Sequence, residues 1–181
     1  MIPPVVVPPP VRSPIYLVGQ APGSREGVLG RPFAWTAGRR LFEWFGGLGV
    51  DEERFRAGVY IAAVCRCFPG KTSAGGDRVP DAAEVENCSR WMRAELEVLA
   101  PRLVITVGRL ACERFLGKGD MAGWIGRSHE GGAAGWEGEV IPLPHPSGAS
   151  SWWKVEPGKT LTARALARIG RHPVWREVFR S

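Results

Sequence analysis

The sequence contains no apolar run that approaches the ~20 residues a membrane-spanning helix needs, and one of its longest runs covers only residues 59–64. The N-terminal stretch, residues 1–14, holds six of the 16 prolines, which argues against both a signal peptide and a helix. Cysteine is scarce, at four residues, and without a secretory context this argues against a disulfide-stapled fold. We therefore expect a cytoplasmic protein that makes no membrane contact.

The composition is that of one globular domain. The chain has 181 residues, of which 44% are hydrophobic and 23% are charged. A net charge of +6 favours a polyanionic partner such as nucleic acid, although many basic proteins bind nothing specific. The eight tryptophans either pack in the core and on the surface or stack against bases.

The hydrophobic pattern alternates between two kinds of segment. Four short, continuous apolar runs predict buried parallel strands: Ile15–Gly19 and residues 59–64, 103–107 and 140–143. Helical patterns lie between and after them, over residues 36–48, 81–99, 109–116 and 160–169. We therefore expect an α/β fold, a three-layer α/β/α sandwich around a short parallel sheet of about four strands. Residues 15–181 would form this single domain after a Pro-rich extension of residues 1–14, with an irregular stretch over residues 117–138.

Three blocks follow predicted strands, at the end of a parallel sheet where such folds bind ligands. The first reads Gly-Gln-Ala-Pro-Gly-Ser-Arg-Glu over residues 19–26 and continues as Gly-Arg-Pro-Phe-Ala-Trp-Thr-Ala-Gly over residues 30–38. The second is Cys-Arg-Cys-Phe-Pro-Gly over residues 65–70, and the third is Pro-His-Pro-Ser-Gly-Ala-Ser over residues 144–150. Each block alone is an ordinary turn or loop, but their shared position in a basic protein favours a functional site.

These blocks resemble the uracil-DNA glycosylase superfamily, which places a Gly-Gln/Glu-x-Pro motif after its first strand and a His-Pro-Ser motif after its last. The sequence is most similar to the family-4 type, whose first motif runs Gly-Glu-Ala-Pro-Gly-x-x-Glu and then Gly-Arg-Pro-Phe. The resemblance continues through Pro69–Gly70, Pro80, Glu84, Cys88, Pro101 and residues 105–109. It spans about residues 15–150, in the order that the family shows.

The resemblance implies a role for each motif residue. His145 would contact the uracil O2 and stabilise the negative charge that develops on the leaving base. Phe33 would stack on the flipped base, in a pocket lined by the first motif: Gln20, Ala21, Pro22 and Gly23. Ser147 would contact phosphate, and the residues after it would enter the space that the base leaves: Gly148, Ala149 and Ser150.

Water activation is less directly assigned, because Ala21 stands where well-known members carry an Asp or Asn that positions water. Glu26 matches an acidic family-4 position, so it is our candidate to orient water or stabilise the cation; its ordinary alternative is a solvated turn residue. Basic residues near the motifs are expected to pair with DNA phosphates: Arg25, Arg31 and Arg66.

The sequence departs from the family-4 pattern in its cysteines. Family-4 enzymes hold an iron–sulfur cluster with four cysteines, two of them near the N-terminus, whereas this chain has none before Cys65. We therefore expect no metal or cofactor. The alternative is a cluster or a zinc ion held by the four thiolates present: Cys65, Cys67, Cys88 and Cys112.

Two further departures concern specificity. The superfamily often recognises uracil with an asparagine after its second strand, but Asn87 is the only asparagine here and falls within a predicted helix. Hypoxanthine and xanthine therefore stay open as target bases. A related branch traps the sugar with a histidine loop before the last motif; His129 lies in that region, but its flanking residues do not match, and we expect a surface residue.

The sequence thus predicts a monofunctional DNA glycosylase that removes uracil from single- or double-stranded DNA in base excision repair, acting as a monomer. Monofunctional chemistry is expected because the motifs contain no lysine to form a Schiff base, and Lys154 lies outside the matched region. The alternatives are a non-catalytic nucleic-acid-binding member of the same fold, a glycosylase for another deaminated base, and an enzyme that acts on free nucleosides or nucleotides.

Overall fold

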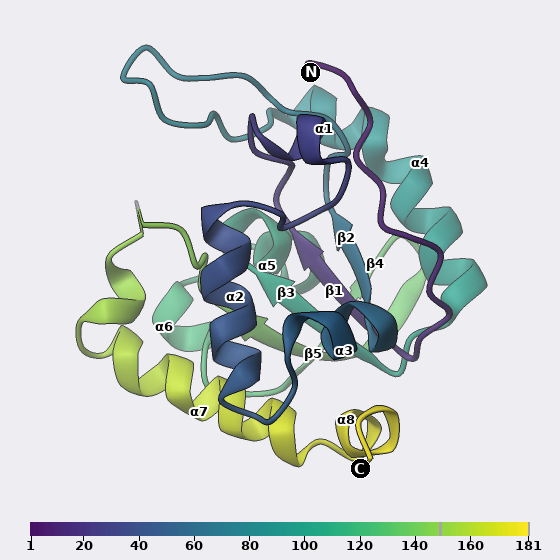
Figure 1. The fold of residues 1–181 in the computed structure, drawn as a ribbon, viewed down its shortest axis with the longest axis vertical. Coiled ribbons are helices and arrows are strands. Elements are labelled where there is room, and N and C mark those ends of the chain that lie inside the picture. The colour runs from purple at the N-terminus through teal and green to yellow at the C-terminus, as the bar shows by residue number, and fades with distance from the viewer. Residues whose placement is uncertain (149, 181) are drawn as a thin grey trace.

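A computed structural model describes residues 1–148 and 150–180. Its centre is a five-stranded sheet in the order β2-β1-β3-β5-β4 (Figure 1). The strands are β1 (Ile15–Gly19), β2 (Tyr60–Ala63), β3 (Leu103–Val107), β4 (His129–Ala133) and β5 (Trp136–Leu143). The first three and β5 are mutually parallel, as predicted, whereas β4 pairs with β5 in the antiparallel sense. The prediction of about four strands therefore missed one edge strand.

The sheet is sandwiched between two helical layers, which confirms the three-layer α/β/α prediction. Alternating side chains of β1 enter two separate cores, because successive residues of a strand face opposite sides of the sheet. Ile15 and Leu17 pack in one core with α2 (Thr36–Gly46), α3 (Glu52–Gly58), α7 (Gly158–Arg171) and α8 (Pro173–Val178). Tyr16 and Val18 pack in the other with α4 (Ala82–Leu99) and α5 (Arg109–Leu116).

Helix α4 begins at a capping motif that the sequence predicts. Asp81 and Glu84 form this capping box, in which each side chain accepts a hydrogen bond from the other residue's backbone N–H. Three short helical segments complete the fold: α1 (Glu26–Leu29), α6 (Met121–Trp124) and the 3₁₀ turn η1 (Trp152–Lys154). Among the described residues, no helix is both long and apolar enough to span a bilayer.

Residues 117–138 are not the irregular stretch that the sequence predicts. They contain α6 and β4, and β4 folds back on β5 through a two-residue turn between Ala133 and Trp136. His129 begins β4, and its Nε2 lies 2.8 Å from the carbonyl oxygen of Trp124. The side chain of this histidine therefore ties the start of β4 to α6.

The Pro-rich N-terminal segment packs along the domain beside α4 (Figure 1). The backbone N–H of Ile2 donates to the Phe68 carbonyl oxygen, and that of Val6 donates to the Arg66 carbonyl oxygen. Val6 is buried, with 3% of its surface exposed. The segment thus covers the chain that leaves β2.

Candidate active site

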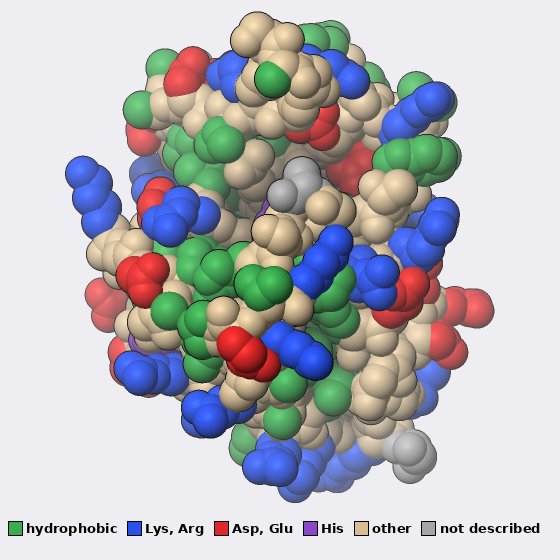
Figure 2. All heavy atoms as spheres, turned by 90° about the vertical axis from the view of Figure 1, so that its left-hand side faces the viewer, with side chains coloured by type: hydrophobic (Ala, Val, Ile, Leu, Met, Phe, Trp, Pro, Cys, Tyr) green, Lys and Arg blue, Asp and Glu red, His purple; other side chains and the backbone are tan. Residues whose placement is uncertain are grey.

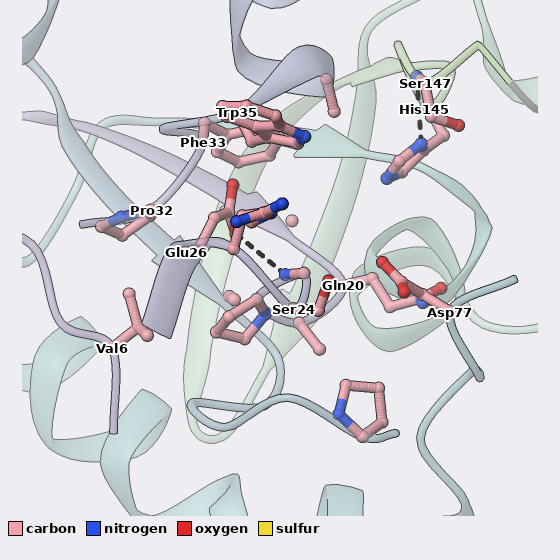
Figure 3. Close-up of a pocket in the computed structure, with 18 of the residues that line it drawn as sticks. Val6, Gln20, Ser24, Glu26, Pro32, Phe33, Trp35, Asp77, His145 and Ser147 are labelled. Atoms are coloured by element: carbon pink, nitrogen blue, oxygen red, sulfur yellow. Dashed lines mark hydrogen bonds between the residues drawn. The ribbon is translucent and has the colours of Figure 1, made fainter. Parts of the chain in front are cut away.

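The three sequence blocks converge on one cavity of about 330 Å³ at the carboxyl ends of the strands. The first block forms much of its wall, the second contributes Pro69, and the third contributes His145 and Ser147 (Figure 3). All of the predicted base-pocket residues line it: Gln20, Ala21, Pro22, Gly23, Glu26, Phe33, His145 and Ser147. Several lining residues lie outside the three blocks and were not predicted: Val6, Asp77 and Arg78. Trp35 lies within the first block, but no role was predicted for it.

His145 follows β5 and lies at the wall of the cavity with one face against Gly108. The backbone N–H of Ser147 donates to its Nδ1 at 3.2 Å (Figure 3). Burial lowers the pKa of His145 below the usual 6.5, and the nearby Asp77 carboxylate partly opposes this. The imidazole is therefore neutral at pH 7, and because Nδ1 accepts, its proton resides on Nε2.

Asp77 brings a carboxylate to the same cavity from the loop that joins β2 to α4. The adjacent Arg78 shapes this loop: its guanidinium donates to the Pro69 carbonyl oxygen at 2.6 Å and to Glu84 Oε1 at 2.6 Å. Hydrogen bonds from Arg78 are the main reason that the pKa of Glu84 falls to about 2. Asp77 is thus presented by a loop that ion pairing ties to α4.

Glu26 is buried, and both of its carboxylate oxygens accept backbone hydrogen bonds. Oε2 accepts from Gly23 N–H at 3.0 Å and Oε1 accepts from Ala34 N–H at 3.1 Å. Burial raises the pKa of this carboxyl above its usual range, against the lowering effect of these backbone donors. Glu26 therefore joins the two halves of the first block. It is not the solvated turn residue that was its ordinary alternative.

Phe33 forms one side of the cavity in a backbone conformation with φ of 52°. Its ring lies directly over Gly19, where an added Cβ would stand 2.7 Å from Phe33 Cζ. Arg56 holds this segment by donating to the carbonyl oxygens of Pro32 and Phe33, each at 3.0 Å. Trp35 continues the wall to the rim, where half of its surface is exposed. An apolar, partly aromatic wall therefore faces His145 across the cavity (Figure 3).

The residues expected to contact DNA lie in different environments. Arg25 is exposed beside the cavity, with its Cζ 5.6 Å from the Trp35 ring centroid. Arg31 is also exposed, and its Nη2 lies 3.9 Å from Glu52 Oε1. Arg66 is different: only 3% of it is exposed, and its guanidinium pairs with Glu95 inside the protein. The expectation that Arg66 contacts phosphate is therefore wrong for this structure. Gly148 is exposed and Ser150 is half-buried, while the predicted Ala149 lies outside the described residues.

The cysteines do not form a ligand set for a cluster or a zinc ion. Burial and the neighbouring Cys88 raise the pKa of Cys65 to about 12, which opposes the thiolate form that binds metals. Cys112 lies in the core beneath α5, with its sulfur 3.3 Å from Thr106 Oγ1. Within residues 1–148 and 150–180, no three Cys, His, Asp or Glu side chains are placed to share a metal ion.

The molecule is an α/β/α sandwich with a partly aromatic cavity at the carboxyl ends of its parallel strands, and comparison with known proteins gives its family. Residues 6–168 match the Uracil DNA glycosylase superfamily, and the chain belongs to it. This confirms the resemblance drawn from the motifs.

Several curated relatives carry related names. The chain is 30% identical over 138 residues to a Type-4 uracil-DNA glycosylase of Pyrobaculum aerophilum, a match that covers 74% of this chain and 66% of the relative. It is 30% identical over 141 residues to that of Archaeoglobus fulgidus, covering 75% and 66%. A Type-5 uracil-DNA glycosylase of Pyrobaculum aerophilum is 34% identical over 113 residues, covering 56% and 47%. The matched region thus spans just under two thirds of the first two relatives.

Proposed function

We propose that the chain is a monofunctional uracil-DNA glycosylase that hydrolyses the N-glycosidic bond of a uracil flipped out of DNA. The observation that carries this proposal is the neutral His145, whose Nδ1 accepts from Ser147 N–H and whose Nε2–H has no acceptor among the described residues, at the wall of a cavity of about 330 Å³. The relatives named uracil-DNA glycosylases support the choice of uracil and of DNA.

The reaction breaks the bond between the sugar C1′ and the base nitrogen, and the bonding electrons leave with the base. The sugar becomes an oxocarbenium-like cation and the uracil becomes an anion whose charge is shared by O2. The Nε2–H of His145 donates to that oxygen as its charge develops, and a buried neutral donor stabilises it without having to surrender a proton. Water then adds to C1′ and loses one proton.

Asp77 is the carboxylate that accepts this proton in our proposal. Its influence on the pKa of His145 and its place on the cavity wall support a position beside the sugar of a bound nucleotide. Glu26 uses both carboxylate oxygens on backbone donors, so we assign it the positioning of the first block. Its expected role in orienting water stays a prediction that substitution can test.

Base recognition rests on shape and on the first block. Phe33 would stack on the base, and its ring is fixed by the close approach to Gly19. Gln20 lines the cavity with a side-chain amide that offers both a donor and an acceptor, the combination that the uracil edge requires. This residue takes the place of the missing asparagine in our proposal. Arg25, Arg31 and Ser147 would contact the phosphates on either side of the flipped nucleotide.

Monofunctional chemistry is supported by the cavity lining, in which the described residues include no lysine to attack the sugar. The test is alkaline cleavage of labelled oligonucleotides that carry one uracil, hypoxanthine or xanthine, with and without a chelator. We expect breaks at uracil that depend on the alkaline step and survive chelation. Breaks without alkali would contradict monofunctional action, and breaks only at a purine would contradict uracil as the target base.

A further inference from the structure

A second concave surface lies apart from the cavity, between α2, η1 and α7. Its walls are two tryptophans, Trp44 of α2 and Trp153 of η1, and Lys154 stands at its edge. Its floor is one face of α7, formed by Lys159, Thr162, Ala163 and Leu166. We call this surface the tryptophan groove. None of these residues lines the cavity around His145.

The groove is built to hold its shape without a ligand. The Trp44 and Trp153 rings meet edge to face, with centroids 5.5 Å apart and planes at 80°. The 3₁₀ turn lies directly on the first turn of α7, where an added Cβ on Gly158 would stand 2.0 Å from the Trp152 carbonyl oxygen. Fixed aromatic rings lose little conformational freedom when a flat partner packs against them.

Positive charge surrounds this apolar surface. Arg40 Cζ lies 5.2 Å and Lys154 Nζ lies 5.3 Å from the centroid of the Trp153 ring. Arg40 also pairs with Glu43, but no carboxylate in the described part of the chain forms a salt bridge with Lys154 or Lys159. Figure 2, which views this side of the molecule, shows Lys and Arg side chains around exposed apolar atoms. Apolar rings beside unpaired cations suit a nucleic acid strand, whose bases stack and whose phosphates are negative.

Helix α2 connects the groove to the cavity. Thr36, at the start of α2, lines the cavity, whereas Trp44 lines the groove. Thr36, Arg40 and Trp44 are spaced four residues apart, so they follow one side of the helix. Trp44 follows Thr36 by eight positions, so at ~1.5 Å rise per residue the two lie about 12 Å apart along the helix axis. That is roughly three to four nucleotides of a stacked strand at ~3.4 Å each.

We propose that the tryptophan groove binds the same DNA strand as the cavity, about three to four nucleotides away from the flipped base. One base packs against Trp44 and Trp153, and the neighbouring phosphates pair with Lys154 and Lys159. This inference rests on the proposed function for the presence of DNA, but its test uses binding to DNA without uracil. It is therefore independent of whether the protein releases a base.

The test measures the anisotropy of labelled, uracil-free single-stranded oligonucleotides of about 5 and about 15 nucleotides, near the two ends of the usual range of site sizes. We expect the longer strand to bind more tightly to the unmodified protein. Trp153→Ala should weaken binding of the longer strand about tenfold and leave the shorter strand within about twofold, because one base no longer stacks. Trp153→Phe, which keeps an aromatic ring, should restore most of the affinity.

Trp91 supplies a matched control. It is 51% exposed on α4, with Arg90 Cζ 4.9 Å from its ring, and α4 covers the other face of the sheet. Trp91→Ala should bind both oligonucleotides as the unmodified protein does. Thermal unfolding of each variant verifies folding. Lys159→Gln, which removes no packing ring, should reduce the slope of log affinity against log salt by about 0.7 for each single-strand phosphate that the lysine neutralises.

Three results would overturn the proposal. The first is equal binding of the longer strand by the unmodified protein and Trp153→Ala. The second is an equal loss for Trp91→Ala, which would mean that exposed tryptophans act without regard to position. The third is a change in self-association of Trp153→Ala on gel filtration with unchanged DNA affinity, which would assign the groove to a second copy of the chain. If neither the unmodified protein nor any variant released uracil, but the longer strand still bound more tightly and this preference depended on Trp153, only the proposed function would be contradicted.

Discussion

Gly108 packs against His145: a Cβ added to Gly108 would stand 3.2 Å from Cδ2 of His145 and 3.3 Å from the Cβ of His145. Gly108 lies between the end of β3 and the start of α5 with φ of 87° and ψ of 165°, a conformation that only glycine adopts readily. Its N–H donates to the Leu143 carbonyl oxygen, which ties the junction to the strand that leads to His145. The junction therefore fixes both the backbone and the ring of the proposed electrophile.

Gly108→Ala should displace the His145 ring. We expect a loss of stability of about 1–3 kcal/mol from the backbone conformation, and a fall in uracil excision of about 100-fold from the misplaced imidazole. Gly49→Ala is the control, because Gly49 also has a positive φ, of 80°, but has nothing within 4 Å of an added Cβ. It should lose about 1–2 kcal/mol and keep its excision rate. Equal excision rates in the two variants would disprove the positioning role.

The lowered pKa of His145 predicts the pH dependence of excision. Because the neutral imidazole is the working form, the rate should not fall as the pH drops from 8 to the unperturbed value of 6.5. Below 6.5 the unfolded chain binds the proton more readily than the folded one, so the free energy of unfolding should fall there with decreasing pH. The ¹⁵N chemical shifts of the His145 imidazole, followed as the pH changes, measure its protonation directly. A ring that titrates above 6.5 would contradict the account.

The two carboxylates in the cavity should respond differently to loss of charge. Asp77→Asn should lower the single-turnover excision rate by about 10²–10⁴-fold with little effect on stability, because the side chain is exposed and acts on water. Glu26→Gln should cost about 1–3 kcal/mol of stability, because one of its two backbone donors loses its acceptor in a buried site. If Glu26→Gln abolished excision and Asp77→Asn did not, the assignment of the water-activating residue would be reversed.

Substitution of single arginines should distinguish those that contact DNA from the one that pairs inside the protein. Arg25→Gln and Arg31→Gln should each lower the slope of log affinity against log salt by about 0.9 on duplex DNA for each phosphate that the arginine neutralises. Arg66→Met should leave that slope unchanged but destabilise the fold by about 3 kcal/mol, because it leaves Glu95 in a largely buried site without its cation. Titration of DNA binding at several salt concentrations, with denaturant unfolding, measures both effects. A lower slope for Arg66→Met would return this residue to the DNA interface.

Much of the fold could be predicted because its central strands carry their own signal. The first and third strands are buried on both faces, and their continuous apolar runs match β1 and β3 residue for residue. The edge strand β4 carries no such signal, because His-Glu-Gly-Gly-Ala neither alternates nor is apolar and is held by pairing with β5. Long-range pairing, which a local pattern does not encode, therefore explains the missing strand.

The site residues likewise fall into two groups, those that the sequence predicts and those that depend on long-range contacts. His145 and the first block stand in motifs directly after strands, so topology alone brings them together. Asp77 lies 14 residues beyond the end of β2 in a polar loop, and its approach to the cavity depends on the hydrogen bonds of Arg78 to Pro69 and Glu84. The burial of Arg66 could not be predicted, because its partner Glu95 is 29 residues away on α4. The only available sequence signal for Asp77 was the length and polarity of its loop.

The most direct test of the account compares uracil excision by the unmodified protein and by His145→Gln under single-turnover conditions. We predict alkali-dependent breaks at uracil for the unmodified protein and a rate about 10²–10³-fold lower for His145→Gln, as for the loss of one oxyanion donor. Affinity for uracil-free DNA should be the same for both. Equal excision by the two proteins, or tight DNA binding with no excision by either, would contradict it.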